Sequence, residues 1–323
     1  MRAIVNTSAN QLELLEYPLP QPGHGQVRIR TVACGICATD MEMIAGWDRT
    51  NFPAIPGHEW AGIIDAVGEN VDNSMVGRKC VAENVLADGG EVGFEHPGGY
   101  AEYFLTSSDK TQFLPDNFSL STATLIEPLA VSVRGIRKLG NRLPEPILIF
   151  GDGPIGLIMT MLLKRGGTKQ LIIVGGRENR LKLAQKLGAT HTFNYHDLGS
   201  EISSAIRQEL KHGFNTVIEA SGNDRAFHDA VELANLDCRI LIVGDYKEGV
   251  ARFKLNTMIH KELRIIGSNA SAGAWVEAVE LAVKEDFPLE KLITHKFPAV
   301  QYEQGFKLMH SRNSEVLKVI LEW

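Results

Sequence analysis

The sequence predicts an α/β protein with two parts, a β-rich first part and a doubly wound parallel sheet. Short apolar and β-branched runs, separated by Gly, Pro or Asn, fill the region before Pro128. From Pro146 onward, apolar strands alternate with helical stretches, which is typical of a parallel sheet covered by helices. At 323 residues, the chain is long enough for two domains.

The composition is that of an ordinary globular protein, with 44% hydrophobic and 22% charged residues. The net charge of −6 and the absence of a basic run argue against a nucleic-acid surface. The longest apolar stretches are only strand-sized, so we expect no membrane span. Four cysteines do not form a disulfide framework, and the N-terminus lacks the features of a signal peptide. We therefore expect a cytoplasmic protein.

The first part of the chain has the pattern of short strands. Val27, Ile29 and Thr31 alternate with Arg28 and Arg30, as in a strand with one buried face. Many short strands at this spacing predict an antiparallel barrel or sandwich. The expected strands are Ala3–Asn6, Gln11–Tyr17, Gln26–Ala33, Trp60–Val67, Arg78–Ala82 and Tyr100–Leu105.

The second part alternates between strands and helices. The expected strands are Ile147–Phe150, Leu171–Val174, Thr216–Glu219, Ile240–Val243 and Arg264–Ile266. The expected helices are Ile155–Lys164, Asn179–Leu187, Glu201–Lys211 and Asp224–Ala234. The tail contains another helix, Ala274–Lys284, and short elements that end in Val316–Leu321, and we expect it to rejoin the first part.

A glycine fingerprint, Gly151-x-Gly153-x-x-Gly156, lies between the first expected strand and helix of the second part. In a dinucleotide site, the first glycine allows a tight turn and the second a close approach to the pyrophosphate. The third lets the helix pack on the strand. Pro154 and Ile155 complete the turn at the helix N-terminus, where phosphates bind. The alternative is an ordinary strand–turn–helix with incidental glycines.

The end of the second strand indicates which dinucleotide is bound. An NAD site places an acid there for the ribose 2′-hydroxyl, whereas this chain has Gly175, Gly176 and Arg177, followed by Arg180. Glycine leaves room for a 2′-phosphate, and a guanidinium can bind it through two hydrogen bonds. The pattern predicts NADP(H) in preference to NAD(H). The adjacent Glu178 is the main counter-argument, because it could instead reach the ribose.

Four residues upstream of the fingerprint form a candidate metal site: Cys37, His58, Glu59 and Glu127. One sulfur, one nitrogen and carboxylate oxygen are donors typical of an unsaturated, catalytic zinc site. Each residue also has a structural interpretation: His58 as a hydrogen-bonded core histidine, Glu59 as a surface pair, and Glu127 as a helix-start acid. Cys34 forms a CxxC pair with Cys37, but no second pair follows, so at most one of the two is a ligand.

Along nearly its whole length, the chain resembles the zinc-dependent medium-chain alcohol and polyol dehydrogenases. The matching segments are Val32–Asp40, Ile55–Gly62, Ile126–Val131, Gly151–Leu157, Leu187–Ala189, Glu219–Gly222 and Val243–Gly244. The resemblance implies a GroES-like catalytic domain from residues 1–127 and 269–323 and a Rossmann coenzyme-binding domain from 128–268. It also implies an active-site cleft between these domains.

The resemblance assigns roles to individual residues. Cys37 and His58 take the places of the thiolate and imidazole ligands, and Glu59 that of the carboxylate at or just behind the metal. Glu127 takes the place that holds a glutamate in the sorbitol-dehydrogenase-like branch. The segment Gly175–Arg177 resembles the Gly-Ser-Arg of NADP-dependent secondary alcohol dehydrogenases. By the same comparison, Tyr195, Ser221, Val243 and Gly244 lie near the cofactor.

Two departures from the family pattern affect the expected chemistry. The segment Glu83–Gly98 contains no cysteine, so we expect one catalytic zinc per subunit and no structural zinc. Glu42 stands where many relatives have the histidine of a proton relay. Thr39, two residues after Cys37, is placed to take the substrate hydroxyl proton, and Glu42, the cofactor ribose or water could carry it outward.

The expected function is zinc-dependent hydride transfer between NADP(H) and a secondary alcohol or ketone, with a polyol or sugar favoured by Glu127. The rival interpretations are a zinc-free quinone or enone reductase of the same superfamily and a non-catalytic NADPH-binding protein. The expected partner is a small-molecule substrate, with no nucleic acid and no membrane. The chain is expected to form a homodimer or homotetramer.

Overall fold

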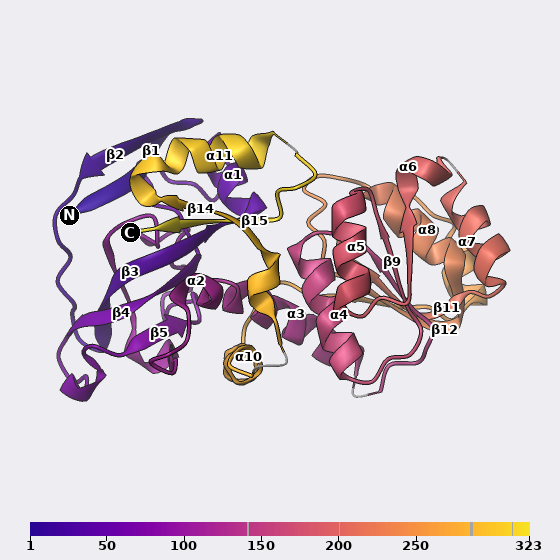
Figure 1. Ribbon diagram of the computed structural model, residues 1–323, viewed down its shortest axis with the longest axis horizontal. Helices are drawn as coiled ribbons and strands as arrows, with labels where there is room; N and C mark the ends of the chain where they lie inside the picture. Colours follow the sequence, from indigo (N-terminus) through magenta and orange to yellow (C-terminus); the bar gives the residue numbers. More distant parts are fainter. Residues whose placement is uncertain (141, 200, 285–286, 312) are drawn as a thin grey trace. The chain divides into compact units, whose positions relative to one another are not determined.

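The computed structural model describes residues 1–140, 142–199, 201–284, 287–311 and 313–323 (Figure 1). The chain forms two compact units. Unit 1 contains residues 1–130 and 272–323, and unit 2 contains residues 131–271. The first division lies inside helix α3 (Ile126–Leu139), three residues after the predicted boundary.

Unit 1 is built mainly from short strands. Its strands are β1 (Arg2–Ser8), β2 (Gln11–Glu16), β3 (Gln26–Ile36), β4 (Glu59–Val67), β5 (Lys79–Ala82), β6 (Tyr103–Ser107), β7 (Thr111–Phe113), β14 (Ile293–Pro298) and β15 (Lys318–Glu322). Its helices are α1 (Ala38–Ala45), η1 (Asn73–Met75), η2 (Ser108–Lys110), α2 (Leu120–Ala123), α10 (Trp275–Ala282), η3 (Leu289–Leu292), η4 (Ala299–Gln301) and α11 (Tyr302–His310), with the start of α3.

The larger sheet of unit 1 is centred on its longest strand, β3, and β1 pairs with β2 in a separate sheet. The strand order is β14-β15-β3-β4-β5-β7, and β6 also pairs with β3. Figure 1 shows the C-terminal strand β15, in yellow, beside β3, and the pairing aligns Ile36 with Val319 and Cys34 with Leu321. The strands of the first part of the chain pair antiparallel, as expected, whereas the tail strands β14 and β15 run parallel to each other.

Unit 2 alternates strands and helices. Its strands are β8 (Ile147–Phe150), β9 (Leu171–Gly175), β10 (His191–Asn194), β11 (Phe214–Glu219), β12 (Ala234–Ile242) and β13 (Arg264–Gly267). Its helices are α4 (Pro154–Arg165), α5 (Glu178–Leu187), α6 (Tyr195–Leu198), α7 (Ile202–Leu210), α8 (Asp224–Leu233) and α9 (Leu255–His260), with the rest of α3.

All six strands of unit 2 pair in parallel, in the order β10-β9-β8-β11-β12-β13. Every residue of β8 and β9 is buried, as expected for strands covered on both faces. The strand order reverses between β8 and β11, which is where a doubly wound sheet binds ligands. This confirms the predicted parallel sheet. Over the described part of the chain, no helix has the length and apolarity needed to cross a membrane.

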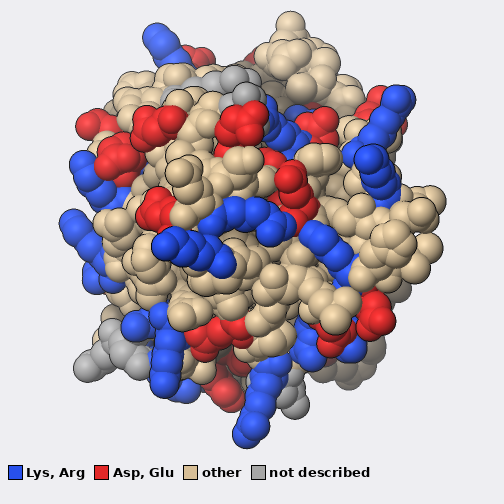
Figure 2. Space-filling model, turned by 90° about the vertical axis from the view of Figure 1, so that its right-hand side faces the viewer, with Lys and Arg blue, Asp and Glu red and all other residues tan. Residues whose placement is uncertain are grey.

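The sequence pattern missed or shortened several elements. The strand β10 and the helix α11 were not expected, and β12 begins six residues before the predicted strand at Ile240. The early part of β12 contains Asn235 and Asp237, whose polarity hides the strand pattern. Figure 2 shows the face of the molecule at the right of Figure 1, where basic and acidic side chains are interspersed. Neither sign forms a continuous patch on that face.

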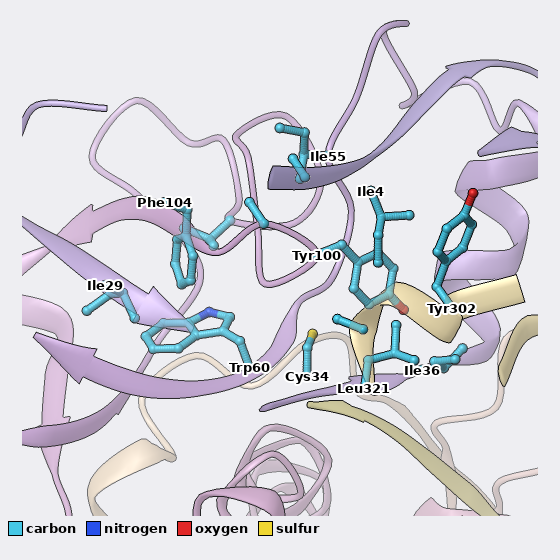
Figure 3. Packing of buried hydrophobic residues seen from close by; sticks show 14 of the residues in the cluster. Ile4, Ile29, Cys34, Ile36, Ile55, Trp60, Tyr100, Phe104, Tyr302 and Leu321 are labelled. Carbon is cyan, nitrogen blue, oxygen red and sulfur yellow. The ribbon is translucent and has the colours of Figure 1, made fainter. Parts of the chain in front are cut away.

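Aromatic rings fill the core of unit 1 (Figure 3). Trp60 packs against Phe104 at 4.8 Å between ring centroids, and Tyr100 packs edge-on against Phe306 at 5.6 Å. The Cys34 side chain points into this core, where burial raises the pKa of its thiol well above the ordinary value. Cys34 is therefore an inert core residue rather than a thiolate.

Candidate metal and cofactor sites

The pairing of β3 with β4 brings three candidate ligands together. Cys37 follows β3 as the N-cap of α1, and Glu59 starts β4 opposite Gly35. The Cys37 sulfur, a His58 ring nitrogen and a Glu59 carboxylate oxygen all lie within 4.8 Å of one another. We call these residues the metal-ligand cluster. Its soft sulfur, imidazole and carboxylate donors suit zinc, so the residues present fit the expected ion.

A buried carboxylate, Asp40, orients the histidine of this cluster. His58 Nδ1 lies 3.1 Å from Asp40 Oδ1, which leaves Nε2 as the nitrogen for a metal. Asp40 Oδ2 accepts hydrogen bonds from the Cys37 amide at 2.8 Å and the Tyr100 hydroxyl at 2.9 Å. The sequence reasoning missed Asp40 and Tyr100. Only the position of Asp40, one turn into a helix that Cys37 caps, could have indicated this role.

The charges around Asp40 shift the pKa values of the pair. Burial opposes ionisation of Asp40, but His58 and three hydrogen bonds to its carboxylate lower its pKa below the ordinary value. Burial also opposes the charged form of His58, but the negative charges of Asp40 and Cys37 raise the pKa of His58 well above its ordinary value. The negative groups around the imidazole therefore favour positive charge in this pocket.

A buried lysine from the C-terminal strand holds the carboxylate of the cluster. Lys318 Nζ lies 2.6 Å from both Glu59 carboxylate oxygens, and the two side chains are only 3% and 2% exposed. Burial opposes the charged form of Lys318, but Glu59 raises its pKa above the ordinary value. The sequence reasoning missed Lys318, which lies in a strand paired with β3 but far away in the chain.

The remaining candidates of unit 1 lie on two helices. Glu127 is in the first turn of α3 and is not part of the metal-ligand cluster. Burial raises the pKa of Glu127 to about 7, and Glu59 adds to the shift. Thr39 is the second residue of α1, with its hydroxyl oxygen 3.7 Å from Cys37 Sγ, and Glu42 lies one turn further along the same helix.

The segment Glu83–Gly98 is held by backbone bridges, ion pairs and ring contacts. Short bridges join Val85 to Glu91 and Val92 to His96. Arg49 pairs with Glu91 at 3.1 Å and with Glu95 at 2.8 Å, and its guanidinium lies over the Phe94 ring. The same ring lies 4.9 Å from His58. Ion pairs and ring contacts thus hold this segment beside the metal-ligand cluster.

The glycine fingerprint of unit 2 has three different environments. Gly151 has φ = +116°, which a side chain would strain, and a Cβ at Gly156 would lie 2.0 Å from the Gly151 carbonyl oxygen. A Cβ at Gly153 would meet no atom within 4 Å. Pro154 begins α4, whose N-terminal amides therefore face the turn. The open space at Gly153 is where a ligand could approach the backbone.

The turn between β9 and α5 differs from the sequence expectation. The glycines were expected to leave room for a 2′-phosphate with no acid nearby. Instead, Asp152 of the fingerprint enters the space beside Gly175, where a Cβ would lie 2.6 Å from its side chain. Asp152 Oδ2 accepts hydrogen bonds from the Gly176 amide at 2.9 Å and the Arg177 amide at 2.8 Å. The turn itself contains no acid, as expected, but an acid from the neighbouring fingerprint lies against it.

The other expected cofactor residues lie around the same edge of the sheet. Tyr195 covers Gly176, where a Cβ would come within 2.3 Å of the phenol. Ser221 follows β11 and bonds through its amide and hydroxyl to the buried Glu219 carboxylate. Val243 and Gly244 follow β12, and both donate backbone hydrogen bonds to the carbonyl of Glu219. Ile155 is in the first turn of α4.

Two family models match the chain. The model described as "Alcohol dehydrogenase GroES-like domain" matches residues 23–116, and the one described as "Zinc-binding dehydrogenase" matches residues 154–284. An L-threonine 3-dehydrogenase of Chromobacterium violaceum is 30% identical over 349 aligned positions, covering 100% of both chains. D-arabinitol dehydrogenase 1 of Uromyces fabae is 26% identical, and the alignment covers 100% of this chain and 97% of that protein.

A solved structure has nearly the same fold. It is described as a short chain alcohol dehydrogenase from Escherichia coli CFT073 complexed with the cofactor NADH. It superposes with a TM-score of 0.94 at 26% identity, over 100% of this chain and 99% of the other. The match supports a GroES-like part and a Rossmann-type sheet in one chain.

Proposed function

The chain belongs to the zinc-dependent medium-chain alcohol dehydrogenase family, and we propose that it transfers a hydride between NADP(H) and a secondary alcohol or its ketone. Its family establishes an oxidoreductase of the alcohol dehydrogenase type. The observation that carries the finer proposal is the metal-ligand cluster, with sulfur, nitrogen and oxygen donors within 4.8 Å. A zinc-free reductase of the same superfamily would not need these three side chains together.

In this proposal, Cys37 and His58 would hold one zinc ion, and Asp40 fixes the imidazole ring through Nδ1. Lys318 holds both oxygens of Glu59, which would stand at or just behind the metal. Glu127 would supply a further carboxylate to the site. When bound, zinc supplies a Lewis acid to a substrate oxygen, and the nicotinamide exchanges a hydride with the adjacent carbon.

The protein's own groups would move the remaining proton. Thr39 takes the proton of the substrate hydroxyl, and Glu42 on the same helix passes it toward solvent. Glu127 has a pKa of about 7 because of burial, so it exchanges a proton near neutral pH. A polyol or sugar suits a site with several carboxylates, because neighbouring hydroxyls can donate hydrogen bonds to them. We propose that class of substrate.

The cofactor proposal rests on unit 2. The turn after β8 would hold the pyrophosphate, with Gly153 and the α4 N-terminus facing it. Arg177 and Arg180 would face the 2′-phosphate of NADP(H), and Tyr195 would pack near the adenine. The partner is a small molecule, and a homodimer or homotetramer is the expected assembly.

The direct test is a steady-state assay with polyols, sugars, secondary alcohols and L-threonine, each with NADP and with NAD. Activity should fall after treatment with a chelator and return when zinc is added. Full activity in a preparation shown to be free of zinc would contradict the proposal and favour the zinc-free reductase. No activity with any alcohol, together with no dinucleotide binding, would favour a non-catalytic protein.

The cofactor part has its own test. Arg177→Ala should lower kcat/KM with NADP and leave the value with NAD nearly unchanged, because only NADP carries the 2′-phosphate. Removing one charged hydrogen-bonding partner corresponds to roughly a tenfold change in the NADP/NAD ratio. An unchanged ratio would contradict the assignment of Arg177.

A further inference from the structure

The carboxylate of Asp152 lies beside the turn after β9, where the 2′-phosphate of NADP(H) is expected to bind. Its side chain is only 7% exposed, and it lies against the turn that follows β9. One oxygen accepts hydrogen bonds from two part-buried amides of that turn, those of Gly176 and Arg177. The other oxygen lies 3.5 Å from Arg177 Nη1 and 3.9 Å from Arg180 Nη1. The acid therefore faces the amides and both of the guanidinium groups.

We propose that Asp152 is an internal counter-anion that limits the preference for NADP(H), so that the enzyme uses both nicotinamide dinucleotides. This inference rests on the proposed dependence on such a cofactor. The turn amides and the two arginines form an anion-binding site of the kind that a 2′-phosphate requires. Asp152 fills the amide part of that site and neutralises one of its two positive charges.

The contact distances explain why Asp152 compensates the arginine charges only in part. The two arginine contacts of 3.5 and 3.9 Å are longer than tight ion pairs, whereas the amide contacts of 2.8 and 2.9 Å are full hydrogen bonds. The Arg177 guanidinium is therefore not held in a tight pair with Asp152. The Arg177 side chain is 35% exposed and accessible to a ligand, whereas that of Arg180 is 13% exposed.

The sequence is consistent with Asp152 as a fixed part of this turn. A side chain at Gly175 would collide with Asp152, and a side chain at Gly176 would collide with Tyr195. The glycines thus make room for an internal acid and an aromatic ring. They do not make an open pocket for phosphate, as their sequence alone had indicated.

The test is the separate measurement of dissociation constants for NADP⁺ and NAD⁺ by calorimetry on the wild type and on Asp152→Asn. The amide side chain keeps an oxygen for the turn amides and removes the charge. NADP⁺ should bind roughly tenfold more tightly, because a negative charge near the 2′-phosphate is gone. The dissociation constant for NAD⁺ should stay within about twofold, because NAD⁺ has no 2′-phosphate to respond to that charge.

A matched control is Glu178→Gln, which also removes one carboxylate charge, at the residue directly after Arg177. Glu178 is exposed and pairs with Lys182 at 3.4 Å, so it should change NADP⁺ binding by less than about threefold. If Asp152→Asn unfolds the protein, Asp152→Ser is the second variant, since its hydroxyl can still accept a turn amide.

Three results would overturn the inference. NADP⁺ binding could stay unchanged in both Asp152 variants, or Glu178→Gln could have an equal effect. Alternatively, Asp152→Asn could weaken NAD⁺ while leaving NADP⁺ unchanged, which would make Asp152 a ligand of the ribose instead. If neither dinucleotide binds the wild type, the proposed cofactor and this inference both fall. If both bind the wild type, the cofactor assignment survives the failure of the Asp152 variants.

Discussion

Two charged clusters, Lys318 with Glu59 in unit 1 and Asp152 with Arg177 and Arg180 in unit 2, differ in how completely their charges are matched. In unit 1, Lys318 holds both oxygens of Glu59 at 2.6 Å, and both side chains are almost fully buried. In unit 2, Asp152 lies 3.5 and 3.9 Å from two arginines, one of which is 35% exposed. The first cluster is a closed arrangement, whereas the second leaves positive charge for a ligand.

This difference indicates that the cluster in unit 1 stabilises the fold, whereas the cluster in unit 2 contributes to ligand binding. A buried charge is tolerated only when a partner and hydrogen bonds compensate for its lost hydration, so breaking the pair in unit 1 should affect folding. A half-exposed charge keeps much of its hydration, so changes in unit 2 should affect binding more than stability. Variants in each cluster therefore test whether the first cluster serves stability and the second serves binding.

The largest expected effect is on stability, from Lys318→Met. It leaves the Glu59 charge buried without its partner, which should lower the free energy of unfolding by about 3–5 kcal/mol in a urea titration. Adding Glu59→Gln should restore most of the loss. The matched control is Lys296→Met, which breaks the exposed pair with Glu322 and should cost less than about 1 kcal/mol. Equal losses at the two lysines would contradict the comparison.

A smaller effect is expected on metal affinity, from Asp40→Asn. His58 loses the carboxylate that fixes its ring and raises its basicity, so zinc should bind roughly 10–100-fold more weakly in competition with a chromophoric chelator. Tyr100→Phe is the control, because it removes one donor to Asp40 but leaves the contact with His58. Unchanged zinc affinity in Asp40→Asn would show that Asp40 serves folding alone.

The smallest effect on stability is expected in the fingerprint of unit 2, from Gly153→Ala. The added methyl meets no protein atom, so the free energy of unfolding should change by less than about 1 kcal/mol. Dinucleotide binding should nevertheless weaken by roughly tenfold, because the methyl occupies the approach to the pyrophosphate. Gly156→Ala is the contrast, with a loss of about 1–3 kcal/mol from its contact with Gly151. Unaltered binding in Gly153→Ala would place the cofactor elsewhere.

The features that could be predicted from the sequence are those that short local patterns encode. The parallel sheet and the fingerprint could be read because each strand, turn and helix has its own periodicity. Lys318 could not, because it meets Glu59 across 259 residues of chain through the pairing of β15 with β3. Asp152 was visible inside the fingerprint, but its effect on Arg177 depends on β8 lying beside β9. Contacts created by strand pairing were the part that sequence reasoning lacked.

The central claim is that Cys37 belongs to a single zinc site, and metal content measures this most directly. Zinc should be determined in the purified wild type, in Cys37→Ser and in Cys238→Ala, whose cysteine is buried in unit 2. We expect about one zinc per chain in the wild type and in Cys238→Ala, and close to none in Cys37→Ser. Full zinc content in a folded Cys37→Ser protein, or no zinc in the wild type, would contradict it.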